Sequence, residues 1–191
     1  MTPVRGHLAR VATTLGLSTA MMVIVVGCSS SGGAQSAPAK TPTAGLLVTY
    51  GPEPTVSAKM ICSPDGQAAL STALNVTAKR VTTPTWVDHL YSCTYQYDSG
   101  SFSVSVKELP TIPATIDYYN ALKAKSTVAQ PVALGQAGFM TTDNTSIVRK
   151  DNKVLDIDVT KLPAQFGQPP RSRTDVSLTI AVALLGCWTG D

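Results

Sequence analysis

The sequence predicts an α+β domain built as a two-layer sandwich, in which about three helices cover an antiparallel sheet of two hairpins. Two segments, 91–107 and 146–160, alternate apolar and polar residues around a short turn, which is typical of hairpins with one buried face. Three other segments, near 64–75, 115–122 and 176–187, carry apolar residues at helical spacing. Because a half-buried hairpin needs a covering layer, we expect the helices to supply it.

The first helix is expected to begin after Ser63. Ser63-Pro64-Asp65 offers an N-cap followed by a proline in the first helical turn. Alanine and leucine residues within 68–74 then form the apolar stripe, and the helix would end near Asn75.

The first hairpin has the clearest pattern in the chain. Residues 91–97 alternate tyrosine and cysteine with small polar side chains, and Cys93 falls on the apolar side. Residues 102–107 alternate phenylalanine and valine with serine and lysine. The Asp-Ser-Gly sequence at 98–100 supplies the turn between them.

Two prolines, Pro110 and Pro113, interrupt the chain after this hairpin. Thr115 can then cap a second helix. The apolar side of that helix would consist of Ile116, Tyr119 and Leu122. Pro131 and the glycines within 134–138 mark a loop or a bent strand.

The second hairpin is expected at 146–160, with its turn at 151–152. Its inward residues would be Leu155, Ile157 and Val159. Thr174 or Asp175 can cap the third helix, from about 176 to 187, which is apolar on nearly every side and would be packed on several sides. A buried strand is the alternative for this segment, but we favour the helix.

The beginning of the chain predicts export. Residues 1–10 include Arg5, His7 and Arg10 and no acidic residue. The apolar run at 11–26 is roughly 16 residues long, which is too short for a typical membrane span of about 20. The run closes with Gly27-Cys28, which resembles the lipobox of bacterial lipoproteins. This resemblance implies that residues 1–27 are a signal peptide, and that Cys28 is lipidated and holds the protein on the outer face of the cell membrane.

The rest of the chain divides into a tether and one domain. Residues 28–44 are rich in serine, glycine, alanine and proline, and we expect a flexible linker there. Residues 45–191 are enough for a single α+β domain.

Composition excludes several classes of function. Lys and Arg total 15 against 12 Asp and Glu, and Arg5 and Arg10 lie in the expected signal peptide, so we expect no nucleic-acid partner. Only His89 follows Cys28 among the histidines, and no CxxC motif occurs, so we expect no metal site. No phosphate loop or dinucleotide fingerprint occurs either, and we expect no cofactor.

Three cysteines follow Cys28, which is an odd number in an oxidising compartment. One disulfide and one free thiol is the simplest arrangement. A bridge between Cys62 and Cys93 would tie the first helix to the sheet, and we favour it. The alternative bridge, between Cys62 and Cys187, would join the first helix to the last.

Each candidate for chemistry also has a structural interpretation that we prefer. His89 leads directly into a strand, Asp156 and Asp158 fit the solvent face of an amphipathic strand, and Cys187 has no base nearby in sequence. We therefore expect no enzyme. Five tyrosines could line a ligand pocket, although a place in the core is the simpler expectation; they are Tyr91, Tyr95, Tyr97, Tyr118 and Tyr119.

The whole chain resembles the small secreted lipoproteins of actinobacteria, mycobacteria above all. The points of resemblance are Cys62 before a helix, Cys93-Thr94-Tyr95, and a terminal Gly-Cys-Trp at 186–188. The spacing of the first two cysteines is similar to that of an actinobacterial lipoprotein family of unknown function, whose four-cysteine pattern Cys187 does not fit. The resemblance brings no activity with it.

We therefore expect an envelope lipoprotein whose non-catalytic domain binds a protein partner or a small amphipathic ligand. One alternative is a lipid or glycolipid carrier, which would need a large apolar cavity beneath the third helix. The other alternative is an envelope hydrolase that uses His89.

Overall fold

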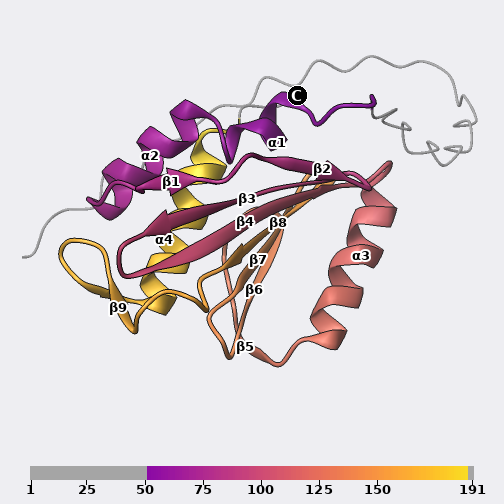
Figure 1. Cartoon of the computed structure of the whole chain (residues 1–191). Coiled ribbons are helices and arrows are strands. Elements are labelled where there is room, and N and C mark those ends of the chain that lie inside the picture. The colour runs from indigo at the N-terminus through magenta and orange to yellow at the C-terminus, as the bar shows by residue number, and fades with distance from the viewer. Residues whose placement is uncertain (1–50, 189–191) are drawn as a thin grey trace, which may run out of the picture. The chain divides into compact units, whose positions relative to one another are not determined.

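The computed structural model describes residues 51–188, and its centre is an antiparallel sheet (Figure 1). The expected signal peptide, Cys28 and the tether lie outside the described residues. The strands of this sheet are β1 (Arg80–Val81), β2 (Thr85–Val87), β3 (Leu90–Tyr97), β4 (Gly100–Glu108), β5 (Val128–Pro131), β6 (Ala137–Thr141), β7 (Ser146–Lys150) and β8 (Lys153–Asp158). Their order is β1-β3-β4-β8-β7-β6-β5, and β2 also pairs with β3.

Four helices and a small two-stranded sheet complete the described part of the chain. The helices are α1 (Val56–Met60), α2 (Pro64–Leu74), α3 (Ile112–Lys125) and α4 (Arg173–Gly186). The small sheet pairs β9 (Gln165–Phe166) with β10 (Arg171–Ser172). The mixed class and the antiparallel sheet are therefore as the sequence predicts.

Both predicted hairpins are present and lie next to each other. They are β3–β4 and β7–β8, and β4 pairs directly with β8. The sheet is nevertheless larger than two hairpins, because β5 and β6 lie on either side of the loop that was expected around 131–138. β1 and β2 extend the other side of the sheet beside β3.

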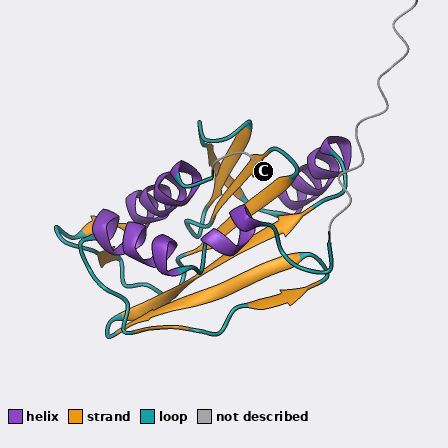
Figure 2. Ribbon diagram, turned by 90° about the horizontal axis from the view of Figure 1, so that it is seen from above, coloured by secondary structure: helices purple, strands orange, loops and turns teal. Residues whose placement is uncertain are grey.

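The two faces of the sheet carry separate cores. Val148 and Leu155 face the larger core, which includes residues of α1, α2 and α4. Their neighbours Ile147 and Val154 point the opposite way and pack with Tyr119 of α3, as the alternation of side chains along a strand requires. Seen from above, α3 stands apart from the other helices (Figure 2). The predicted two-layer arrangement is therefore too simple, since helices lie on both faces.

The first helix of the prediction corresponds to α2. The Ser63 hydroxyl accepts a hydrogen bond of 3.1 Å from the N–H of Gly66, and Pro64 occupies the first turn. The helix ends at Asn75, whose φ of 52° is left-handed. The start, its cap and the end of this helix were predicted correctly.

The predicted caps of the other two helices were wrong. α3 begins after Thr111 instead of Thr115, and Pro113 lies in its first turn, where a missing N–H costs nothing. α4 begins after Ser172, whose hydroxyl accepts from the N–H of Asp175 at 3.2 Å. In both cases the capping hydroxyl lies two or more residues earlier than the sequence pattern indicated.

The last element is a helix, and the alternative of a buried strand was wrong. The side chains of Val176, Ile180 and Leu184 are fully buried against the sheet and α2. Val182 is 56% exposed, so α4 keeps one uncovered apolar side and is not packed on every side. No helix within residues 51–188 is long and apolar enough to span a membrane.

The far edge of the sheet is formed by β5, whose four residues are all exposed. β5 pairs with β6 from Val128 to Pro131, with a shift of register between Val128 and Gln130. Immediately after the strand, the N–H of Val132 donates to the carbonyl oxygen of Gly138 at 2.9 Å.

Candidate ligand-binding face of the sheet

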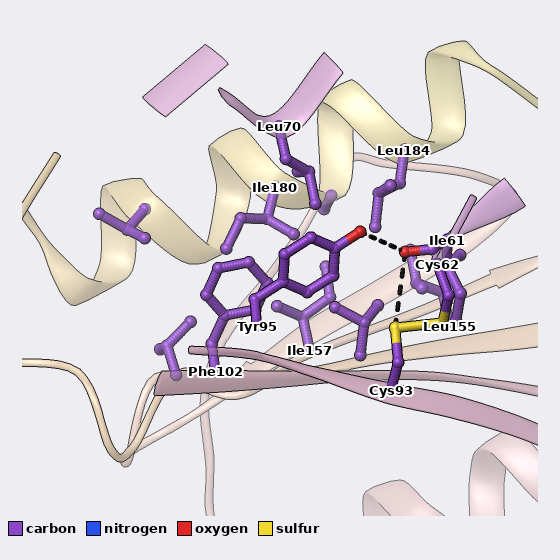
Figure 3. Close-up of a cluster of buried hydrophobic side chains, with 14 of the residues drawn as sticks. Ile61, Cys62, Leu70, Cys93, Tyr95, Phe102, Leu155, Ile157, Ile180 and Leu184 are labelled. Carbon is purple, nitrogen blue, oxygen red and sulfur yellow. Dashed lines mark hydrogen bonds between the residues drawn. A yellow bond between two sulfur atoms is a disulfide. The ribbon is translucent and has the colours of Figure 1, made fainter. Parts of the chain in front are cut away.

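The cysteine pairing that we favoured is present. Cys62 and Cys93 form a disulfide with a Cα–Cα distance of 6.1 Å, which joins the start of α2 to the buried side of β3 (Figure 3). Cys187 is a half-buried free thiol just after α4, and the alternative Cys62–Cys187 bridge is wrong.

Two of the five tyrosines are core residues and do not face a ligand. Tyr95 is 1% exposed, and its hydroxyl donates a hydrogen bond of 2.7 Å to the carbonyl oxygen of Ile61. Burial raises the pKa of Tyr95 above its ordinary value. Tyr119 lies in the core on the other face, edge-on to Phe139 at a ring-centroid distance of 5.4 Å.

Tyr91 and Tyr97 are half-buried beside the larger core. The Tyr97 ring lies 5.8 Å from Phe102 and 4.8 Å from Phe166, and burial raises its pKa to about 12. Tyr97 also lines an open pocket of about 320 Å³ with Gln168 and other residues. The tyrosines therefore do not converge on one pocket.

Tyr118 is the tyrosine that the structure brings to a polar surface. It is half-buried on α3, and burial together with the negative charges of Asp156 and Asp88 raises its pKa. Tyr118 thus lies near Asp156, a proximity that their positions in the sequence do not indicate. Both belong to the sheet face that α3 covers only in part.

Beside α3, the strands β2, β3, β4 and β8 leave a hydroxyl-rich surface without a helical cover. One row across these strands consists of Thr85, Ser92, Ser105 and Asp156, each the register partner of the next. A second row consists of Thr94, Ser103 and Asp158. We call these two rows the hydroxyl face.

Within the hydroxyl face, neighbouring side chains are partly hydrogen-bonded to each other. The hydroxyls of Thr85 and Ser92 lie 2.9 Å apart, as do those of Thr94 and Ser103. The face is hollowed by a groove of about 220 Å³. The groove is lined by Thr82, Thr83, Thr85, Ser92, Cys93, Thr94, Ser103, Val104 and Ser105.

Each row ends in a carboxylate, and the two carboxylates differ. Asp158 accepts hydrogen bonds from the N–H and the hydroxyl of Thr160 at 2.8 and 2.6 Å. The Asp156 carboxylate has no hydrogen-bond partner within the described residues. Burial, and then the negative charges of Asp158 and Asp143, raise the pKa of Asp156 to about 6. Asp156 is therefore poorly solvated, although the sequence pattern assigned it to an ordinary solvent face.

The remaining candidates for chemistry lie elsewhere. His89 is exposed in the turn between β2 and β3, with a φ of 55°, and its ring is edge-on to Trp86 at 5.4 Å. Within residues 51–188, no three His, Cys, Asp or Glu side chains form a group that could hold a metal ion.

Two open apolar grooves flank the uncovered side of α4. One, of about 440 Å³, lies beside α2 and includes Ala73. The other, of about 290 Å³, lies beside the segment 130–134. Leu178 and Val182 line both grooves.

Comparisons with protein-family models, with curated proteins and with solved structures give no match to this chain.

Proposed function

We propose that this protein is a cell-envelope lipoprotein, anchored through Cys28, whose non-catalytic domain binds a ligand outside the membrane. The observation that carries the proposal is the order of the first 28 residues: basic residues, an apolar run of signal-peptide length, then Gly27-Cys28. A lipidated cysteine in this position would keep the domain at the membrane surface after cleavage.

The disulfide supports the same compartment. The Cys62–Cys93 bridge lies within the core, and both cysteines are nearly inaccessible to solvent. Disulfides of this structural kind persist in exported proteins and are rare in a reducing cytosol. The bridge is therefore the arrangement expected of a domain that folds after export.

The hydroxyl face is the surface that we propose for ligand binding. It combines a groove, unused hydrogen-bonding capacity at Asp156 and the nearby amphipathic ring of Tyr118. A protein partner is the other occupant that the sequence suggests, and such a partner would need an interface larger than this groove.

A lipid or glycolipid carrier is the second candidate function, favoured by the apolar grooves on either side of Leu178 and Val182. We place it second because α4 packs directly on the sheet. Ile180 and Leu184 are fully buried there, in the position where a carrier would need an internal cavity.

Membrane fractionation tests the anchor. The full chain is expressed in an actinobacterial host, and the Cys28→Ala variant is compared with a Cys187→Ala control, which removes the free cysteine of the described domain. The wild type and the control are expected in the membrane fraction, and Cys28→Ala is expected to leave it. A Cys28→Ala protein that stays in the membrane fraction as fully as the wild type would overturn the proposal.

A further inference from the structure

The hydroxyl face contains a gap in its hydrogen bonding. Ser105 on β4 and Asp156 on β8 are register partners, and side chains in such positions have Cβ atoms about 4.5–5.5 Å apart. Neither side chain makes a hydrogen bond within the described part of the chain. Ser92, the next residue along the row, is already paired with Thr85. Within this row, the unused donors and acceptors are therefore at Ser105 and Asp156.

We propose that the hydroxyl face binds a neutral carbohydrate chain, with one sugar hydroxyl seated between Ser105 and Asp156. This inference rests on one part of the proposed function, namely that the domain binds a ligand. It commits to a ligand class that the sequence alone does not indicate.

The chemistry of the two rows selects a neutral ligand that is rich in hydroxyl groups. A carboxylate only accepts hydrogen bonds, so the group that meets Asp156 must donate one. A serine or threonine hydroxyl donates once and can accept twice, so the ligand must supply both donors and acceptors along the row. Sugar hydroxyls do both. An apolar ligand would leave these groups desolvated and unpaired, which costs free energy.

Charge argues against anionic ligands. Asp156 and Asp158 end the two rows side by side on β8, and their mutual repulsion contributes to the raised pKa of Asp156. A phosphate or carboxylate placed there would add a further like charge. On the neighbouring strand β4, the ammonium group of Lys107 is hydrogen-bonded to Asp88 at 2.9 Å. A neutral oligosaccharide avoids this repulsion.

Tyr118 is near enough to Asp156 for their charges to interact. A half-buried phenol presents both ring surface and a hydroxyl, which suits the mixed apolar and polar surfaces of a sugar ring. Burial and the nearby Asp156 and Asp88 charges raise the pKa of Tyr118. Its hydroxyl therefore stays protonated and can donate a hydrogen bond throughout the neutral pH range.

The hydroxyl face could be polar simply because it is exposed to solvent. Two observations argue against this alternative. The surface is hollowed beside Thr82 and Thr83. A freely solvated aspartate also keeps a low pKa, whereas burial is the first cause of the raised pKa of Asp156. A desolvated carboxylate without hydrogen-bond partners, next to a groove, is typical of a binding site.

The experiment measures binding of three neutral oligosaccharides, chitopentaose, maltopentaose and mannopentaose, to the detergent-solubilised full chain by saturation-transfer NMR. The variants are Ser105→Val and Asp156→Asn, and the matched control is Asp117→Asn, an exposed aspartate on α3. We expect at least one oligosaccharide to bind with a dissociation constant near 1 mM, and each of the first two variants to weaken it by about tenfold. Asp117→Asn should change it by less than about twofold.

Two outcomes overturn the inference. The first is that none of the three oligosaccharides binds at concentrations up to about 10 mM. The second is that one binds but Ser105→Val and Asp156→Asn behave like the Asp117→Asn control. Valine is well suited to a strand, and circular dichroism checks that each variant is folded. Neither outcome bears on the anchor, because fractionation of the Cys28→Ala variant tests it separately.

Discussion

The hydroxyl of Tyr95 and the carbonyl oxygen of Ile61 lie 2.7 Å apart in a hydrogen bond that connects β3 to the turn between α1 and α2. Ile61 directly precedes Cys62, and the sulfur of Cys93 lies 3.8 Å from the same carbonyl oxygen (Figure 3). One short segment is thus held to one strand both by a covalent bond and by a buried hydrogen bond.

We expect the Tyr95→Phe substitution to lower the free energy of unfolding by about 1–2 kcal/mol. The change removes one hydroxyl and leaves the buried Ile61 carbonyl oxygen without this donor, while the ring can keep its stacking on Phe102 at 4.8 Å. Urea denaturation followed by circular dichroism measures the effect. Stability equal to that of the wild type would show that the hydrogen bond contributes nothing.

Replacing Cys62 and Cys93 together by alanine is expected to lower the free energy of unfolding by about 2–4 kcal/mol. The bridge closes a loop with a sequence separation of 31, and its loss frees that loop in the unfolded chain. Cys187→Ala is the control and should have a smaller effect, since this thiol is only half-buried. If the control lowers the free energy of unfolding as much as the double variant does, the disulfide is not the cause of the lost stability.

The Glu108→Ala substitution should cost about 2 kcal/mol of stability. One carboxylate oxygen of Glu108, a residue that is 1% exposed, accepts hydrogen bonds from both the N–H and the hydroxyl of Thr55, the N-cap of α1. Glu108→Gln keeps an acceptor oxygen and should cost less than alanine does. Thermal denaturation compares both with Glu53→Ala, which removes an exposed carboxylate and should change little.

Asp156→Asn is expected to stabilise the protein at pH 7.5, by about 1–2 kcal/mol. Because the folded-state pKa of Asp156 is raised to about 6, the folded protein holds this proton more tightly than the unfolded chain does. The associated stability is fully present below about pH 4 and is lost as the pH rises through about 6. The wild type should therefore lose stability over this interval.

The measurement is the urea midpoint at several pH values between 4 and 7.5. Asp156→Asn should flatten the dependence over this interval, and Asp117→Asn, which removes an exposed aspartate, is the control. A wild type whose stability rises between pH 4 and 6, with no difference in Asp156→Asn, would be incompatible with the assignment. If Asp156→Asn both stabilises the protein and weakens sugar binding, the Asp156 carboxylate serves binding and lowers the stability of the fold.

The sequence predicts the local features of this fold well. The two-residue period within β3 and β4 identifies a hairpin directly, and it also places Cys93 on the buried side. The cap and the end of α2 follow from Ser63 and Asn75, because both effects act within one turn of helix.

Features that depend on distant residues were missed. The strands β5 and β6 contain Pro131 and Gly138, which argue locally against strands, and the pairing of β6 with β7 and of β5 with β6 is what makes them strands. The hydroxyl face needs the register between β4 and β8, which places Ser105 opposite Asp156. The serines at alternate positions of β4 were visible in the sequence, but nothing in it indicated that β8 pairs with the other side of β4.

The outer edge of β5 has a consequence for copies of this protein that are crowded together. Because the N–H of Val132 points toward β6, the nitrogen of Pro131 points away from the sheet, where it offers no donor to another strand. The irregular pairing near Val128 further disturbs that edge. Exposed sheet edges tend to join between molecules, and a proline at this position opposes such joining. The domain can therefore expose a four-residue strand to its neighbours and still resist edge-to-edge aggregation.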